Sequence, residues 1–329
     1  MKKALIYIFI TSIIFVWYIY PTKQKVIVET PLYTRSQCQK STLAAPRGFI
    51  GIADLSITKP ESQQLLKELR ASFVRVEVRW DNIEKTRGEY DWTELDAIVE
   101  FLNKENATAI FTINHPPVWS HDIEEFGNNT SIFITVLAKR YKSYIDYYEI
   151  FNEPNLPGYG WPFPNSNMRH NATLYASVLT LTNQALREVD EDAFIILGGL
   201  SISDHPQEFL HEIYQQTNKN CFDIVSIHPY GRSKKLVETL AEYRTITTKY
   251  NDAEKPIWFG EFGTSDDSIM LETLQDTLRQ VNELDGLIWF SLRDLKPYGW
   301  NFGLVEYDGT KKPAFYEFKA YLKNEDTDD

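Results

Sequence analysis

The feature that most limits how this chain can fold is a steady alternation of short apolar runs with amphipathic stretches from residue 47 onward. Short runs rich in β-branched and aromatic residues predict strands, and longer stretches with apolar residues three or four apart predict helices. The predicted strands lie at 48–54, 73–80, 108–114, 145–152, 194–199, 222–228, 256–261 and 286–291. The predicted helices lie at 60–71, 92–104, 130–143, 171–189, 206–217, 234–250, 267–283 and 313–323. Eight consecutive pairs predict a single closed parallel (β/α)8 barrel, the TIM-barrel class of α/β fold.

A doubly wound sheet is the other fold that such alternation allows. It usually carries a glycine-rich phosphate loop after its first strand. Here that turn reads IADLSITKP and lacks one. No internal repeat or linker divides the alternating region, so we expect one barrel domain over residues 47–325.

Residues 1–46 do not share the alternation. Two lysines precede an apolar run from Ala4 to Tyr20, which predicts a membrane-spanning signal anchor over residues 1–21. A cleaved signal peptide is the alternative, but the run ends in bulky residues with no small-residue cleavage site directly after it. Residues 22–46 are polar and contain prolines, so they predict a tether. The domain is then expected outside the cytoplasm, periplasmic or extracellular, and secreted if the first segment is cleaved.

The two cysteines are Cys38 in the predicted tether and Cys221 in the barrel. An oxidising compartment would allow them to pair and to fasten the tether to the domain. No CxxC or HExxH pattern occurs, and the six histidines are scattered. We therefore predict no metal site and no other cofactor.

The charge balance limits the partners of the chain. With 34 basic and 46 acidic residues, the formal net charge is −12, which argues against binding to nucleic acid or to an anionic membrane surface. A neutral substrate is compatible with this charge. Aromatic residues make up 14% of the chain, an excess that suits a groove lined with flat rings.

Reactive residues of such barrels gather at the C-terminal ends of the strands. Glu153 follows the fourth predicted strand, just before a proline that cannot continue a ladder. Glu261 ends the seventh strand, close to two glycines. The third, fourth, sixth and eighth strands contribute further polar and aromatic candidates, namely Asn114, His115 and Trp119, then Asn152, then His228 and Tyr230, and finally Trp289.

The second strand alternates valines with Arg75, Glu77 and Arg79. Side chains alternate between the two faces of a strand, so the valines should face the helices and the charges the barrel interior. Charges buried there need partners. Arg75 next to Glu261 would satisfy that requirement.

Two carboxylates at the ends of opposite strands can carry out glycoside hydrolysis, in which one group is a protonated acid and the other a nucleophile or base. A separation of about 5–5.5 Å between the carboxyl groups would indicate retention of configuration. Because sugars have apolar CH faces, tryptophans are candidate stacking platforms, with Trp289 the first choice for a subsite wall. The others are Trp80, Trp119, Trp161 and Trp300.

The sequence around both glutamates resembles the clan A retaining glycoside hydrolases. FNEPN resembles the clan's strand-4 acid/base motif, and WFGEFG resembles its strand-7 nucleophile motif. The stretch VRVEVRWDNIEKTRGEYDWTELDAIV and the closing WFSLRD and FGLVEYDGTKKPAFYEF are similar to family 39, which holds β-xylosidases, α-L-iduronidases and bacterial exopolysaccharide endoglycosidases. Family 5 has overlapping motifs and is the next candidate. The resemblance covers about residues 47–323.

The resemblance implies a retaining hydrolase of a carbohydrate substrate, with Glu153 as the acid/base and Glu261 as the nucleophile. Asn152 would hold the substrate 2-hydroxyl. Tyr230 and Arg75 would keep Glu261 ionised and aimed.

His228 would line the subsite on the non-reducing side of the substrate. The chain lacks the length of family 39 xylosidases, which carry an added β-sandwich. Its size and predicted anchor look more like the exopolysaccharide endoglycosidases, which makes polysaccharide synthesis or export machinery a candidate partner. The substrate-binding set is completed by Asn114, His115, Trp119, Trp80 and Trp289.

Two alternatives belong to other functional classes. A barrel of this type can lose activity and serve as a carbohydrate-binding subunit of a polysaccharide assembly, but the presence of both carboxylates favours an enzyme. A metal-dependent barrel hydrolase would need clustered His and Asp ligands at the strand ends, and we expect these to be missing.

Overall fold

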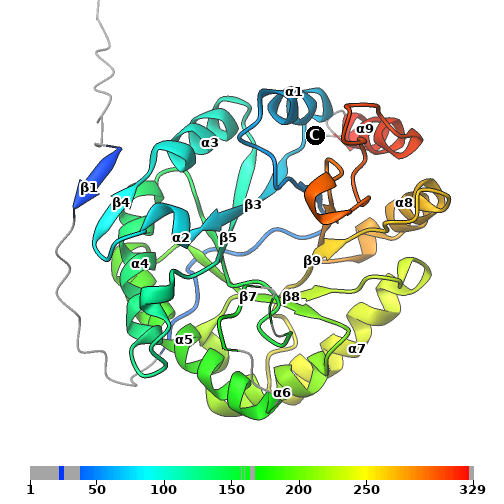
Figure 1. Ribbon diagram of the computed structural model, residues 1–329. Coiled ribbons are helices and arrows are strands. Elements are labelled where there is room, and N and C mark those ends of the chain that lie inside the picture. Colours follow the sequence, from blue (N-terminus) through cyan, green and yellow to red (C-terminus); the bar gives the residue numbers. More distant parts are fainter. Residues whose placement is uncertain (1–21, 26–37, 157, 159, 164–166, 326–329) are drawn as a thin grey trace, which may run out of the picture.

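The computed structural model describes residues 22–25, 38–156, 158, 160–163 and 167–325. Eight parallel strands form a ring with helices around it (Figure 1). The order around the ring is β10-β2-β3-β5-β6-β7-β8-β9, so the first and last barrel strands pair and the sheet closes. The predicted (β/α)8 barrel is confirmed.

Each predicted strand and helix is present, with shifted ends. The barrel strands are β2 (Ile50–Ala53), β3 (Phe73–Arg79), β5 (Thr108–Asn114), β6 (Tyr147–Ile150), β7 (Phe194–Ser201), β8 (Ile224–His228), β9 (Ile257–Phe262) and β10 (Gly286–Phe290). The surrounding helices are α1 (Pro60–Leu69), α3 (Thr93–Lys104), α4 (Phe126–Tyr141), α5 (Met168–Val189), α6 (Pro206–Gln216), α7 (Leu236–Lys249), α8 (Met270–Leu278) and α9 (Pro313–Glu325).

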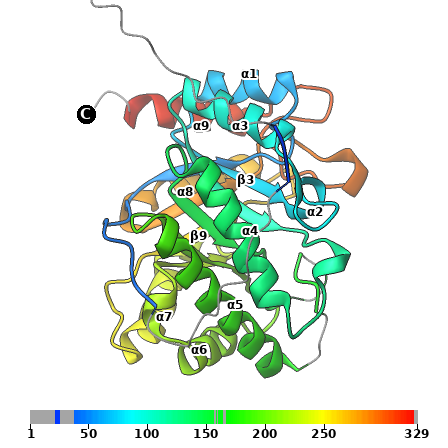
Figure 2. The same cartoon turned by 90° about the vertical axis from the view of Figure 1, so that its left-hand side faces the viewer.

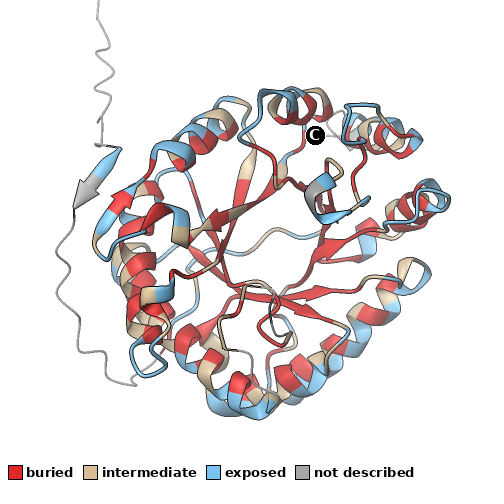
Figure 3. Cartoon of the chain, viewed as in Figure 1, coloured by how far each residue is buried: buried red, intermediate tan, exposed pale blue. Residues whose placement is uncertain are grey.

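The helices lie against the barrel through one apolar face. In α3 the side chains of Leu95, Ile98, Val99 and Leu102 recur at the helical period, and all four are buried. Figure 3 shows the same division around the ring, with buried faces toward the strands and exposed faces toward solvent. At the end of the chain α9 lies beside both α8 and α1 and completes the helical layer (Figures 1 and 2).

Aromatic rings fill the N-terminal end of the barrel. Phe49 and Phe73 stack with their ring centroids 4.1 Å apart, and Tyr147 and Phe194 stack at 5.0 Å. Trp258 contacts Phe49 edge-on at 4.8 Å. All five lie at or near the start of a strand, so the interior of the barrel is filled at this end, and we expect the reactive residues at the opposite end.

The described parts of the predicted tether are docked on the barrel. The short strand β1 (Lys23–Lys25) pairs antiparallel with β4 (Glu89–Asp91), which follows β3 and the short helix α2 (Trp80–Ile83). Strand pairing satisfies the backbone groups of these residues and fixes their position.

Residues 38–46 lie along the N-terminal end of the barrel. The backbone N–H of Ser41 donates to the Asp223 carboxylate at 2.7 Å. Cys38 forms a disulfide with Cys221, and their Cα atoms are 4.8 Å apart. The pairing that the sequence allowed is therefore present, and this part of the tether is fastened to the domain.

In the described part of the chain, no helix combines the length and the apolar character that crossing a membrane requires. The predicted anchor, residues 1–21, lies outside the described residues.

Candidate active site

Glu153 lies just after β6, in a turn with two unusual backbone angles. Phe151 and Glu153 have φ values of 62° and 45°, in the left-handed region that residues other than glycine seldom adopt. The backbone N–H of Phe151 donates to the carbonyl of Ile113 at 2.9 Å, and that of Glu153 donates to Gly199 at 3.1 Å. These bonds hold a strained turn, a feature that concentrates at functional sites. Glu153 is buried, at 7% exposure.

Glu261 lies in β9 and is held by two donors. Nη1 of Arg75 donates to its Oε1 at 2.6 Å, and the hydroxyl of Tyr230 donates to its Oε2 at 2.9 Å. Burial and the charge of Glu261 raise the pKa of Tyr230 well above its ordinary value, so the hydroxyl stays protonated and can donate. The predicted proximity of Arg75 and Glu261 is confirmed.

His228 joins the two glutamates. Its Nδ1 lies 2.9 Å from Oε1 of Glu153 and 3.6 Å from Oε2 of Glu261. Burial disfavours the charged imidazole, but the two carboxylates outweigh burial and raise the pKa of His228 above its ordinary value. One oxygen of each glutamate and a ring nitrogen of His228 lie within 4.8 Å of one another. The ends of β6, β8 and β9 thus meet at one point.

Beneath this point lies Glu149, a site residue that the sequence reasoning missed. It is 1% exposed and accepts hydrogen bonds from Nε of Arg75 at 2.6 Å, Oγ1 of Thr112 at 2.6 Å and the N–H of Gly199 at 3.0 Å. Nη2 of Arg75 also donates to Oδ1 of Asn152 at 2.8 Å. The signal for Glu149 was a charge within the otherwise apolar run YYEIF, because a charge inside a buried strand requires a partner.

A second cluster lies at the ends of β3 and β5. Glu77 accepts a hydrogen bond from Nδ2 of Asn114 at 3.1 Å, and Nε2 of His115 lies 3.0 Å from the same carboxylate oxygen. Glu77 and His115 are partly exposed, at 27% and 37%. Gly160 covers Asn114 so closely that a Cβ atom there would lie 1.7 Å from Oδ1. The predicted residues Asn114 and His115 therefore surround Glu77, which was not chosen from the sequence.

Trp80 and Trp289 do not lie with these residues. Trp80 has no exposed surface and stacks on Phe133 of α4 with the ring centroids 4.8 Å apart. Trp289 is also fully buried and contacts Phe262 edge-on at 6.1 Å. Both rings belong to the layer between strands and helices, so they cannot form the wall of a sugar subsite. Trp119 is half-buried and lies edge-on against Trp80 at 5.9 Å.

Phe290, next to Trp289, faces the barrel interior. It belongs to the interior cluster, and its ring contacts those of Phe302 at 5.7 Å and Tyr230 at 6.5 Å. Successive side chains of a strand point to opposite faces. The sequence prediction chose Trp289, but the aromatic ring that faces the barrel interior belongs to Phe290, one residue later.

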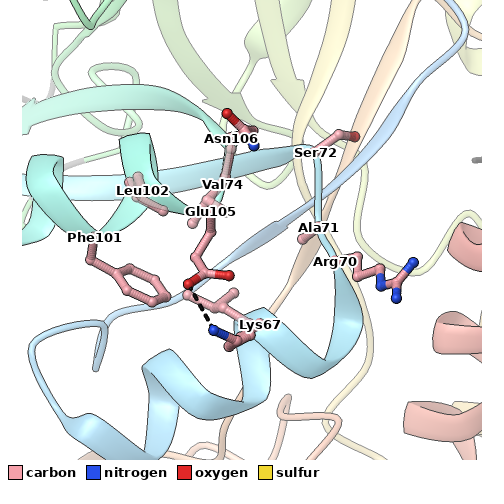
Figure 4. A pocket seen from close by; sticks show the side chains of 11 residues that line it. Lys67, Arg70, Ala71, Ser72, Val74, Phe101, Leu102, Glu105 and Asn106 are labelled. Atoms are coloured by element: carbon pink, nitrogen blue, oxygen red, sulfur yellow. Dashed lines mark hydrogen bonds and ion pairs between the residues drawn. The ribbon is translucent and has the colours of Figure 1, made fainter.

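A cavity of about 480 Å³ lies away from these residues, between α1 and α3 (Figure 4). It is lined by the ends of the two helices and by the turns that lead into β3 and β5, at the N-terminal end of the barrel. Lys67 and Glu105 form an ion pair there at 3.2 Å. None of the predicted site residues lines this cavity, and we assign no chemistry to it.

The cluster of Glu153, His228 and Glu261 also has a spacing at which a metal ion could be held. The scattered histidines of the sequence did not predict this cluster. Arg75 lies 2.6 Å from Glu261, and its fixed positive charge disfavours a second cation at the same carboxylate.

Comparison with known sequences gives one family. The sequence profile of Cellulase (glycosyl hydrolase family 5) matches residues 39–301, which include all eight barrel strands and both glutamates. This is the second of the two families that the motifs suggested. No curated protein matches the chain.

Several solved structures share the fold. A family 39 glycoside hydrolase from the gut symbiont Bacteroides cellulosilyticus WH2 gives a TM-score of 0.67 at 17% identity, over 84% of this chain and 64% of that one. An exo-β-1,4-mannosidase from Opitutaceae bacterium strain TAV5 gives 0.63 at 17% identity, over 84% and 59%. A family 1 β-glucosidase from Thermotoga maritima gives 0.63 at 14% identity, over 86% and 99%. The chain thus spans less than two thirds of the first two proteins, and at these identities the likeness establishes the barrel fold alone.

Proposed function

This chain belongs to the cellulase family, glycosyl hydrolase family 5, and we propose that it hydrolyses O-glycosidic bonds with retention of configuration, using Glu261 as the nucleophile and Glu153 as the acid/base. The observation that carries this proposal is the convergence of the two carboxylates, with one oxygen of each within 4.8 Å. Retaining enzymes hold their carboxyl groups about 5–5.5 Å apart, and inverting enzymes separate them further to admit a water molecule.

The different surroundings of the two glutamates support their roles. Glu261 accepts hydrogen bonds from a cation and a phenol, which stabilise a carboxylate and fix the direction of its oxygens. Glu153 has His228 as its hydrogen-bonding partner. A proton carried by Glu153 can therefore pass to the leaving group while Arg75 stays bound to Glu261.

The proposed reaction has two displacements. Glu261 attacks the anomeric carbon and forms a glycosyl ester while Glu153 gives its proton to the departing oxygen, whose bond to carbon breaks. A water molecule then attacks the same carbon, its proton passes to Glu153, and the ester bond breaks to restore the Glu261 carboxylate. Asn152, whose Oδ1 accepts a hydrogen bond from Arg75, would hold the hydroxyl next to the reacting carbon.

We infer a neutral, β-linked sugar chain as the substrate. The family description is that of a cellulase, and two of the similar structures carry the names of a β-mannosidase and a β-glucosidase. The net charge of −12 favours a neutral substrate over a polyanion. Cellohexaose, mannohexaose and xylohexaose are therefore the first oligosaccharides to test, with the anomer of each fresh product followed by proton NMR. The β anomer should appear first, and an α anomer in the first spectra would contradict retention.

A metal-dependent hydrolase is the second candidate because the cluster of Glu153, His228 and Glu261 could hold a cation. The two candidates respond differently to a chelator. Hydrolysis by two glutamates should persist in EDTA, whereas loss of activity in EDTA and its return with a divalent cation would establish the metal reaction. An inactive carbohydrate-binding barrel would bind the same sugars without releasing product.

We further propose that the domain works outside the cytoplasm. The disulfide between Cys38 and Cys221 supports this location, because such bonds persist in oxidising compartments. Anchoring in the membrane through residues 1–21 and association with polysaccharide synthesis or export machinery remain predictions from the sequence.

A further inference from the structure

Arg75 distributes its hydrogen bonds over three side chains of the candidate active site. Nε donates to Glu149 at 2.6 Å, Nη1 to Glu261 at 2.6 Å and Nη2 to Asn152 at 2.8 Å. Because a guanidinium is planar and rigid, the bond that holds Nε also sets the directions in which Nη1 and Nη2 point. Glu149 therefore shares one rigid group with the proposed nucleophile and with the amide that would hold the sugar hydroxyl.

Glu149 is itself held from the strands on either side of it. Its Oε2 accepts a hydrogen bond from Oγ1 of Thr112, its register neighbour on β5, at 2.6 Å. Its Oε1 accepts one from the backbone N–H of Gly199 on β7 at 3.0 Å. The pairing of β7 with β8 shifts register next to Gly199, and such an irregularity releases backbone groups from the ladder. The carboxylate of Glu149 is thus fixed before it reaches Arg75.

An ion pair at this depth is costly to bury. Arg75 and Glu149 are 5% and 1% exposed, and apolar residues of similar volume can often replace a buried ion pair without loss of stability. Two residues earlier on β6, the interior position is filled by Tyr147, which stacks on Phe194. Packing alone therefore does not require a carboxylate at position 149, and its charge points to a role in the site.

The charge of Glu149 changes the balance around Arg75. Burial would lower the pKa of Arg75 and raise that of Glu149, but their mutual attraction outweighs it, with help from Glu261 and His228. Arg75 therefore has a raised pKa and Glu149 a lowered one, so both are charged. Arg75 and Glu261 alone would form a neutral pair. With Glu149 the group has one negative charge in excess, which stabilises the positive sugar of the transition state in a buried site.

We propose that Glu149 is a positioning residue of the reaction, which holds Arg75 in the orientation that aligns Glu261 and Asn152 and which keeps the site negative. The inference rests on the proposed glycosidase function. Glu149 lies beneath the reacting groups and acts on the substrate only through Arg75. Its replacement should therefore weaken both the attack by Glu261 and the contact of Asn152 with the hydroxyl next to the reacting carbon.

The kinetic test compares two buried carboxylates, each paired with an arginine at 2.6 Å. Glu149→Gln changes the partner of Arg75, and Asp223→Asn changes that of Arg187 at the other end of the barrel. On p-nitrophenyl β-glycosides, Glu149→Gln should lower kcat/KM roughly 10- to 100-fold. The ratio of kcat/KM on the 2-hydroxy substrate to that on the matching 2-deoxy substrate should fall roughly 3- to 10-fold, about the loss of one hydrogen bond. Asp223→Asn should keep the wild-type ratio.

Thr112→Val is the milder second variant, because it removes one hydrogen bond from Glu149 and leaves every charge in place. It should lower the same ratio by a smaller factor, and it decides the question if Glu149→Gln does not fold. A wild-type ratio in each of these variants that folds would overturn the proposal. A ratio that falls equally in Asp223→Asn would also overturn it, because the effect would then follow from lost stability alone.

A measurement without substrate separates this proposal from the catalytic one. In proton NMR spectra of the full-length protein, the signal of the Arg75 Nε–H is identified as the one that Arg75→Lys removes. This signal should move upfield and exchange faster with solvent in Glu149→Gln, and it should be unchanged in Asp223→Asn. That response in a protein that hydrolyses no glycoside would contradict the proposed enzyme but keep Glu149 as the residue that positions Arg75. An active hydrolase whose Arg75 signal ignores Glu149→Gln would do the reverse.

Discussion

Nδ1 of His228 lies 2.9 Å from Oε1 of Glu153, so the glutamate that follows the fourth barrel strand shares a hydrogen bond with an imidazole. The other glutamate, Glu261, takes its hydrogen bonds from Arg75 and Tyr230. Because the two carboxylates have such different partners, we expect their removal to have different effects on the reaction.

Removal of each glutamate should separate the two steps of the reaction. Glu261→Ala should abolish hydrolysis of every substrate, because no ester can form without the nucleophile. Glu153→Ala should lose roughly 10²- to 10⁴-fold on natural linkages, yet still form the ester from aryl glycosides with acidic phenols. Azide needs no base, so it should rescue the Glu153 variant and give a β-glycosyl azide from a β-linked substrate.

The stereochemistry of the azide product checks the assignment. In the Glu261 variant, azide would attack from the vacated side and give the opposite anomer. A retained azide from Glu261→Ala together with an inverted one from Glu153→Ala would reverse the two roles. Wild-type activity in both variants would place the site elsewhere.

Glu149→Gln should destabilise the protein more at neutral than at acid pH. Burial alone would raise the pKa of Glu149, but Arg75 and His228 outweigh it and lower the pKa below 4.5. Its stabilising effect is therefore complete above pH 4.5 and is lost as the pH falls through the lowered value. We expect a loss of about 3–5 kcal/mol at pH 7, measured by urea unfolding, and a smaller loss near pH 3. Glu100→Gln, on an exposed helical position, should leave the stability unchanged at both pH values.

Asp54→Asn should stabilise the protein at neutral pH. Burial raises the pKa of Asp54 to about 6, and its Oδ2 has no hydrogen-bond partner among the described residues. The folded state holds the proton of Asp54 more tightly than the unfolded state does. Ionisation of Asp54 therefore lowers the stability of the fold as the pH rises from 3.8 to about 6, and this loss persists at higher pH. The Asp54→Asn protein should therefore be more stable than the wild type by up to about 3 kcal/mol at pH 7 and equally stable at pH 3.5. Equal gains at both pH values would show that charge is not the cause.

Reduction of the disulfide should lower the melting temperature. The bond between Cys38 and Cys221 joins residues 183 positions apart, and closing a long loop stabilises a fold by about 2–5 kcal/mol. The Cys38→Ala/Cys221→Ala protein should melt at the temperature of the reduced wild type and should not respond to dithiothreitol. A response of that variant would point to an effect of the reductant itself.

The full-length protein should sediment with membranes, because the apolar run from Ala4 to Tyr20 has no clear cleavage site. Limited proteolysis within residues 21–46 should release the barrel from the membrane. A mature N-terminus close to residue 21 in the medium would establish a cleaved signal peptide instead.

The barrel and both catalytic candidates could be predicted from the sequence because they depend on local patterns. The strand and helix periods fix which faces are buried, and the strand ends fix where Glu153 and Glu261 meet. The side chains around them depend on register and on distant partners. A shift of one residue in the register of the strand decides which of Trp289 and Phe290 faces the barrel interior. The part of the tether near Cys38 docks through Asp223, which is far along the chain.

The pairing of β2 with β10 unites the first and last barrel strands, with Ile52 beside Trp289. During synthesis β2 leaves the ribosome more than two hundred residues before its neighbour. Until then the growing sheet has two open edges, which readily pair with other chains. The proposed nucleophile Glu261 precedes β10, so a polypeptide interrupted between them would hold both glutamates but no closed ring to position them. Such a fragment should aggregate rather than persist as a smaller active enzyme.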